Sequence, residues 1–270
     1  MTIITISRGS YSKGKEVAEK VASKLGYKCL SREVILDASD IYHVPEIKLK
    51  KAIHDSPSIL ERMADKKKAY IAFYQSSLTG RVKEDDVVYH GLAGHLLLKG
   101  IPHVLKVRII ADLEDRILTE MKREGVTRQE AIGMIKKDDE ERRRWTQNLY
   151  GADPWDSHLY DLVVHVHKFT VDDAVAFICD AAKLPQFKTT KQSREKMDDL
   201  ALASRIKAFL IENHFDASVL SESGNVLIYI KGDDRLLNKI NETLGDLPED
   251  IRGINNIEIH RNIPPHENAI

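Results

Sequence analysis

The chain has 270 residues, 42% of them hydrophobic and 31% charged, a composition that excludes a disordered or collagen-like protein. No apolar run approaches the roughly 20 residues that span a bilayer, and residues 1–10 show no secretory signal. The net charge of −1 gives no general attraction to nucleic acid. Since the two cysteines, Cys29 and Cys179, suit neither a disulfide framework nor a metal site, we expect a cytoplasmic protein that binds neither nucleic acid nor a membrane.

The charge is divided unevenly along the chain. Residues 196–270 contain 8 basic and 13 acidic residues, a net charge of −5, whereas residues 1–195 contain 33 and 29, a net charge of +4. A mildly basic N-terminal part suits a phosphate-bearing ligand, although a solvated surface gives the same count.

The first 30 residues predict the start of an α/β fold. Residues 2–7 are short, apolar and β-branched, as in a buried strand. A loop of small residues follows, and from Lys15 to Leu25 the apolar positions repeat at helical spacing. Gly26 stands where a helix C-terminal glycine belongs, and a short strand is expected at 27–30.

The next 155 residues predict crossover connections and therefore a parallel sheet. Residues 31–85 are mostly helical, with breaks at Pro45 and Pro57. Further strands are expected at 86–90, 103–110 and 160–166, and further helices at 113–149, with a break near Gly125, and at 172–182.

The last third of the chain changes pattern. Residues 184–193 are polar and aperiodic, which indicates a linker. We therefore predict a first domain at 1–185, a linker at 186–198 and a small α+β module at 199–270. The elements expected in that module are helices at 199–213 and 233–244 and strands at 217–220, 226–230 and 256–260.

The sharpest motif lies between the first strand and the first helix. It satisfies G-x-x-x-x-G-K, in which glycines let backbone N–H groups surround phosphate oxygens and the lysine reaches the outer phosphates. The helix N-terminus adds partial positive charge. Glu16 stands where a hydroxyl would usually hold Mg²⁺, and the alternative is an ordinary glycine-containing turn. The predicted phosphate-binding residues are Gly9, Ser10, Tyr11, Ser12, Lys13, Gly14, Lys15 and Glu16.

Residues 1–185 resemble the cytidylate kinase-like family. The resemblance rests on Ile4-Thr-Ile-Ser-Arg8 and Ser12-Lys-Gly-Lys-Glu-Val-Ala18, and on Ser31-Arg-Glu-Val-Ile35, which is similar to the family's D-R-E-L-I. It continues in order through Val87-Val-Tyr-His-Gly91, residues 104–116, Asp139-Glu-Glu-Arg142, Asp153-Pro-Trp155 and Tyr160-Asp-Leu-Val163. Two positions depart from the family pattern near the acceptor site: Ser31 replaces an Asp, and Leu92 stands where an Arg is usual.

The resemblance implies a P-loop parallel sheet with flanking helices, a helical lid, and the use of ATP and Mg²⁺. It places Arg142 in the lid, where a guanidinium would stabilise charge on the transferred phosphoryl group. On composition alone, the charged run 136–144 would be a solvated helix. The residues expected to act in catalysis are Lys15, Arg142 and Arg116, and those expected to bind the substrate are Arg8, Arg32, Gly91 and Arg123.

Histidines form two further groups. His90 and His95 follow a predicted strand end, where α/β folds commonly bind ligands. His165 and His167 are two residues apart on a predicted strand and therefore share a face. A metal site needs a third ligand, which the sequence around them does not supply, so we expect ordinary sheet histidines and no metal-binding residues.

The C-terminal module weakly resembles the BON domain, through 206–209, 226–230 and 253–259. It carries no obvious catalytic chemistry, so we expect a docking or oligomerisation module. For the whole chain we expect an ATP-dependent kinase of a nucleoside monophosphate, CMP-like, or of a similar small phosphate acceptor. The alternative is a nucleotide-binding regulatory protein without efficient catalysis; RNA binding has little support, because basic and aromatic residues do not interleave.

Overall fold

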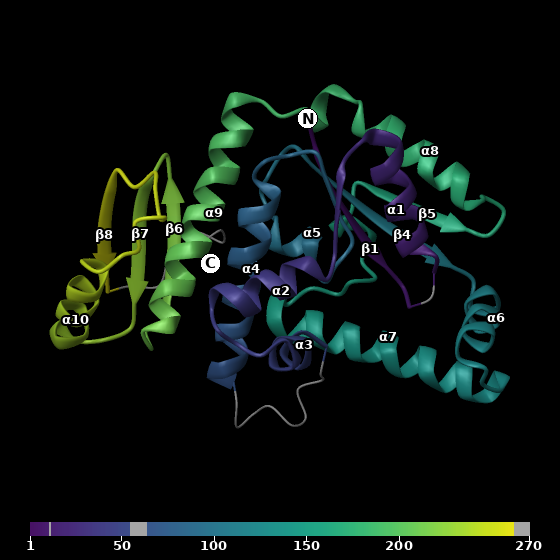
Figure 1. Cartoon of the computed structure of the whole chain (residues 1–270), viewed down its shortest axis with the longest axis horizontal. Coiled ribbons are helices and arrows are strands. Elements are labelled where there is room, and N and C mark those ends of the chain that lie inside the picture. The colour runs from purple at the N-terminus through teal and green to yellow at the C-terminus, as the bar shows by residue number, and fades with distance from the viewer. Residues whose placement is uncertain (11, 55–63, 262–270) are drawn as a thin grey trace.

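A computed structural model describes residues 1–10, 12–54 and 64–261. Its larger sheet has five parallel strands in the order β2-β3-β1-β4-β5, so that β1 is the central strand (Figure 1). The parallel sheet confirms the predicted fold class. The strands are β1 (Ile3–Arg8), β2 (Lys28–Leu30), β3 (Val87–Tyr89), β4 (Val104–Ala111) and β5 (Leu162–Val166).

Alternation along the strands divides the core into two layers, because successive side chains point to opposite faces. Ile3 packs in the layer beneath α2, α4 and α5, whereas Ile4 and Ile6 pack in the layer beneath α1 and α8. The helices of these layers are α1 (Gly14–Leu25), α2 (Glu33–Ile41), α3 (Glu46–His54), α4 (Ala64–Val82), α5 (Gly94–Leu97) and α8 (Val171–Ala182). The break expected at Pro57 lies outside the described residues, and α5 is a short helix that the sequence pattern did not predict.

The predicted lid segment forms two helices, α6 (Leu113–Glu124) and α7 (Arg128–Tyr150). Gly125 ends α6 in the left-handed conformation, at the predicted break. Thr127 and Glu130 form a capping box that starts α7. The indole N–H of Trp145 donates to the carbonyl oxygen of Ala52 at 3.1 Å, so α7 is anchored to α3 across the molecule. A short 3₁₀ turn, η3 (Ser157–Leu159), leads from α7 towards β5.

A second sheet lies beyond α9 (Lys191–Glu212), which separates it from α4 (Figure 1). Strands β6 (Ala217–Glu222) and β7 (Asn225–Ile230) are antiparallel, and β8 (Asn256–His260) pairs parallel to β7. With α10 (Asp234–Leu244), the order is α-β-β-α-β, as predicted for the C-terminal module. No helix in the described ranges is long and apolar enough to cross a membrane.

The predicted linker is wrong in its secondary structure. Residues 185–187 form a 3₁₀ turn, η4, and α9 begins at Lys191, eight residues before the predicted helix. The physical reason is a capping box that a polar sequence conceals: the Thr190 hydroxyl accepts from the Ser193 N–H, and the Ser193 hydroxyl accepts from the Thr190 N–H. Arg194 then pairs with the buried carboxylate of Asp85. The division into domains at 1–185 and 199–270 stays a prediction.

Because α9 contributes to both hydrophobic cores, truncating a side chain near its start should destabilise the N-terminal part. Met197 is 1% exposed and packs in the core of the larger sheet, whereas Leu202 and Ile206 pack in the core of the C-terminal sheet. We expect Met197→Ala to lower the free energy of unfolding by about 2–5 kcal/mol, measured by urea denaturation. The exposed neighbour Lys196→Ala is the control, and an equal effect of the two variants would contradict the shared core.

Candidate functional site

The loop after β1 is tied to the neighbouring strand by its own backbone. The Gly9 N–H donates to the carbonyl oxygen of Ile109 at 3.3 Å, and the Ser12 hydroxyl lies 3.1 Å from the same oxygen. Lys13 takes the left-handed conformation, with φ of 61°, and α1 begins at the next residue. Tyr11 lies outside the described residues. A strand, a tight loop and a helix N-terminus therefore meet in the order that phosphate binding requires.

Lys15 lies at the start of α1, and its side chain does not line the cavity beside the loop. Since α1 begins at Gly14, Lys15 stands in the first helical turn, where its ammonium group lies 3.7 Å from Glu19 one turn later. Its side chain is 67% exposed. Glu16 likewise pairs with Lys20 at 3.3 Å on the helix surface. The role of Lys15 in binding phosphate stays a prediction.

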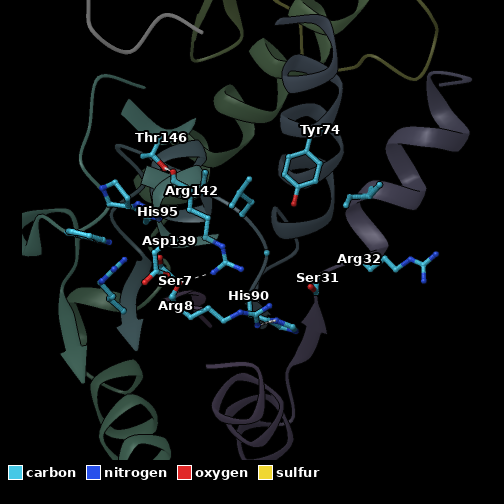
Figure 2. Close-up of a pocket in the computed structure, with 18 of the residues that line it drawn as sticks. Ser7, Arg8, Ser31, Arg32, Tyr74, His90, His95, Asp139, Arg142 and Thr146 are labelled. Atoms are coloured by element: carbon cyan, nitrogen blue, oxygen red, sulfur yellow. Dashed lines mark hydrogen bonds between the residues drawn. The ribbon is translucent and has the colours of Figure 1, made fainter. Parts of the chain in front are cut away.

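Arg8 lies over Gly14 instead. A Cβ at position 14 would be 2.7 Å from the Arg8 Cβ, so the glycine makes room for this side chain. The Arg8 guanidinium donates to His90 Nδ1 at 3.0 Å (Figure 2). Burial and then the neighbouring Arg142 lower the pKa of Arg8, which is the cost of placing two cations side by side.

Arg116 and Asp139 hold the loop from the lid side. Arg116 Nε donates to the carbonyl oxygen of Ser10 at 2.6 Å, and its Nη2 lies 2.6 Å from the Asp139 carboxylate. That carboxylate also accepts the Ser10 N–H at 3.2 Å. An anionic oxygen is thus already bound by the loop backbone. The buried Ser10 hydroxyl has no hydrogen-bond partner among the described residues.

A cavity of about 280 Å³ opens beside the loop, between the strand ends and α7 (Figure 2). One carboxylate, Asp139, is among its lining residues, and Gly91, Leu92 and Ser31 line it near β2 and β3. A side chain at Gly91 would collide with the Tyr89 ring. The basic residues that line the cavity are Arg8, Arg32, Lys50, Arg108 and Arg142.

Three of these cations form no ion pair with a carboxylate at contact distance within the part of the chain that the structure describes, although Glu19 and Asp153 act on Arg8 and Arg108 from further away. Arg8 bonds to His90, Arg142 donates to the carbonyl oxygen of Arg8 at 3.3 Å, and Arg108 donates to the Tyr160 hydroxyl at 3.2 Å. Arg32 and Lys50, in contrast, both pair with Glu46 at 2.8 Å. Because a buried cation is costly without a counter-ion, the cavity is prepared for an anion.

The structure places the predicted substrate-binding residues unevenly. Arg8, Arg32 and Gly91 line the cavity, but Arg123 does not: it is 53% exposed on α6 and pairs with Glu120 and Glu124. Lys50 and Arg108 also line the cavity and were not predicted from the sequence. For Arg108 a signal was present, because a charged residue in the middle of the apolar strand β4 is itself unusual.

Two buried histidines complete the lining. Burial and the nearby Arg8 lower the pKa of His90 to about 4, and burial and Arg108 lower the pKa of His95 to about 3. Since an arginine can only donate, His90 Nδ1 must accept, which leaves its proton on Nε2. Both imidazoles are therefore neutral at neutral pH, and the positive charge of the cavity comes from arginine and lysine.

These pKa values predict a loss of stability in mild acid. The unfolded chain protonates both histidines near pH 6.5, whereas the folded chain does so only near pH 4 and pH 3. The unfolded state therefore binds more protons in that window, and the free energy of unfolding should fall as the pH falls, by up to about 1.4 kcal/mol per pH unit for each histidine. Urea denaturation between pH 7 and pH 4 measures the slope.

The variants His90→Asn and His95→Gln keep a polar group at the bonded nitrogen and remove the titration, so each should flatten the slope. A wild-type slope unchanged in both buried variants would contradict the neutral assignment.

Comparison with known proteins identifies the family of the chain. The sequence model of the cytidylate kinase-like family matches residues 3–168. Cytidylate kinase from Methanopyrus kandleri is 31% identical over 104 residues, which are 36% of this chain and 54% of that protein. The enzyme from Thermococcus kodakarensis is 30% identical over 96 residues, 36% of this chain and 49% of that protein. The chain thus spans about half the length of the curated relatives it matches.

A solved structure agrees in fold. The crystal structure of an uncharacterized protein from Eubacterium ventriosum covers 67% of this chain and 98% of its own, with a TM-score of 0.51 and 23% identity. That match supports the arrangement of strands and helices alone. The family match covers more than half of the chain and contains β1 to β5, the loop after β1 and helices α6 and α7. On that ground the chain belongs to the cytidylate kinase-like family.

Proposed function

We propose that the protein is an ATP-dependent phosphotransferase whose acceptor is a nucleoside monophosphate, CMP-like, or a similar small phosphorylated molecule. The observation that carries the proposal is the group of three arginines, Arg8, Arg108 and Arg142, that line one cavity and form no direct ion pair with a carboxylate among the described residues. Guanidinium groups suit phosphate oxygens, because they offer two parallel N–H donors.

The loop after β1 fits the donor phosphates. The Ser10 N–H already donates to an anionic oxygen, that of Asp139, and the Ser10 hydroxyl is buried without a partner. A phosphate oxygen would compete with the Asp139 carboxylate for this N–H and add the charge that the N-terminus of α1 favours. Gly9 carries no side chain that would hinder such an approach to the loop backbone.

Asp139 is a better candidate ligand for Mg²⁺ than Glu16. Its carboxylate is the hard oxygen ligand that Mg²⁺ prefers, it lines the cavity, and it lies beside the loop. Bound there, the ion would neutralise charge on the donor phosphates. Glu16 points instead to Lys20 on the surface of α1.

The chain's own side chains would then align and stabilise the reactants. Arg8 and Arg142 approach each other from β1 and α7, so a phosphate between them would be held from the loop side and from the lid side. Ser31, Arg32 and Gly91 line the same cavity, which supports the acceptor site that the family resemblance implies near them. Phosphoryl transfer needs no protein nucleophile, and positioned cations supply most of its catalysis.

The test is ATP turnover with a panel of acceptors, namely the nucleoside monophosphates, sugar phosphates and phosphonates, followed by ADP release. We expect turnover with at least one acceptor that carries a phosphate, dependent on Mg²⁺. Saturable ATP binding by calorimetry with no turnover across the panel would contradict the kinase.

That second result would favour the alternative, a nucleotide-binding regulatory protein. One observation supports it: the loop presents neither an inward lysine nor a hydroxyl at position 16, since Lys15 is 67% exposed. In such a protein the C-terminal module would transmit the nucleotide state to a partner or a second copy, through α9, which both cores share.

A further inference from the structure

A group of side chains that could bind a metal ion lies outside the cavity, just after the C-terminal ends of β4 and β5. The residues are Asp112, Asp115 and His167, and their ligand atoms all lie within 4.8 Å of one another. His167 Nδ1 is 3.2 Å from one Asp112 carboxylate oxygen and 3.0 Å from an oxygen of Asp115. The fold assembles the group from two separate segments, the start of α6 and the end of β5, which lie side by side because β4 and β5 are neighbours.

The carboxylate of Asp112 is not used as a helix cap. Asp112 occupies the N-cap position of α6, where an aspartate usually accepts a backbone N–H of the first turn, but its side chain makes no such bond. It faces two imidazoles instead: its Oδ1 lies 3.0 Å from His165 Nε2, and its Oδ2 faces His167. The two rings are stacked, with centroids 6.0 Å apart. The Asp112 side chain thus contacts the two histidines and does not cap α6.

Two of the three separations between ligand atoms are close to those in a tetrahedral site. Donors about 2.0–2.1 Å from a tetrahedral ion lie roughly 3.3 Å from one another. The two nitrogen–oxygen separations, 3.2 and 3.0 Å, are close to that value. The three residues are half-buried or exposed, so an ion would reach them from solvent and keep a position for water.

The donor types select the class of ion. Imidazole nitrogen suits zinc, copper, iron and nickel, whereas Mg²⁺ prefers oxygen ligands and keeps its own waters. The group contains one imidazole and two carboxylates, with a second imidazole beside one carboxylate. It is therefore a poor site for the Mg²⁺ of phosphoryl transfer. It is a good site for a tetrahedral ion with borderline preferences.

We propose that Asp112, Asp115 and His167 bind a divalent ion of the zinc class, with His165 holding Asp112 in place. The site is separate from the catalytic cavity, since none of these four residues lines it. Bound metal would join the end of β5 to the first turn of α6. The residue after Asp115 is Arg116, which holds the loop carbonyl of Ser10, so the ion would also stiffen the support of the phosphate loop.

The competing explanation is a set of ordinary ion pairs between histidine and aspartate. Both explanations place the same atoms at hydrogen-bond distance, but they differ in metal affinity and in its dependence on each ligand. An ion pair gives no saturable site of one ion per chain, and it gives no selectivity for Zn²⁺ over an excess of Mg²⁺.

The experiment is calorimetric titration of the nucleotide-free full chain with Zn²⁺, in the presence of millimolar Mg²⁺, together with Co²⁺ as a spectroscopic probe. We expect one Zn²⁺ per chain and the visible absorption of tetrahedral Co²⁺. The variants Asp112→Asn, Asp115→Asn and His167→Ala should each weaken binding by on the order of 10²-fold, since each removes a ligand from a site that needs them all.

The matched control is His158→Ala. His158 also pairs with a carboxylate, Asp156, at 2.8 Å, but it is 93% exposed and the pair offers only two ligands. The control should bind Zn²⁺ as the wild type does, and all variants should keep the wild-type circular dichroism because the replaced groups are at the surface. Zn²⁺ affinity that is equal in the wild type and the three ligand variants would overturn the proposal, as would a loss of the same size in His158→Ala.

Discussion

Replacing Arg142 with alanine should lower phosphoryl-transfer turnover by on the order of 10²-fold or more while changing ATP affinity much less. Arg142 reaches the cavity from α7 and lies against the Arg8 carbonyl, on the lid side of the loop. A cation in that place acts most strongly when charge develops on the transferred group, so its removal should affect the transition state more than ground-state binding. Steady-state turnover and calorimetric ATP binding, measured on the same preparation, separate the two effects.

A conservative variant and a neighbouring arginine sharpen this test. Arg142→Lys should restore only part of the activity, because a point charge does not reproduce a two-pronged donor. Arg144→Ala is the matched control: Arg144 is on the same helix, but it is 59% exposed and pairs with Glu140 one turn earlier. Once an acceptor is identified, wild-type turnover by Arg142→Ala would remove Arg142 from the site.

The spacing of apolar residues and the positions of glycines in the sequence predicted most of the helices and strands. The β-branched runs became β1, β4 and β5, and glycines such as Gly26 and Gly125 ended helices where predicted, because these signals depend on a few adjacent residues. The start of α9 was missed for a local reason as well. Its capping box uses Ser193 rather than a glutamate, so the segment reads as a polar linker.

The site was less predictable than the fold, because it depends on contacts between distant residues. Arg108 comes from a central strand, Lys50 from α3 and Arg142 from α7, and only the folded chain brings them to one cavity. The histidine pair on β5 shows the same limit. Its carboxylate neighbours stand more than fifty residues earlier, at the start of α6, and no spacing rule connects the two segments.

Lys15 satisfies the sequence motif, but its exposed side chain lies beside Glu19 on the surface of α1. Arg8 lies at the end of β1, next to the loop, and lines the cavity, whereas Lys15 does not line it. We therefore expect Arg8→Ala to lower turnover by on the order of 10²-fold or more, as for a buried cation that contacts the transferred phosphate. Lys15→Ala should lower it by less than about fivefold, the equivalent of the ~1 kcal/mol of an exposed charge.

Gly14→Ala tests the same arginine without removing its charge. Gly14 is the buried first residue of α1, so the higher helix preference of alanine does not by itself stabilise the variant. The alanine Cβ would stand 2.7 Å from the Arg8 Cβ, and the arginine would have to move. We expect turnover to fall nearly as far as in Arg8→Ala, with circular dichroism unchanged. Wild-type turnover by Gly14→Ala and Arg8→Ala, together with a large loss in Lys15→Ala, would return the donor-binding role to the lysine.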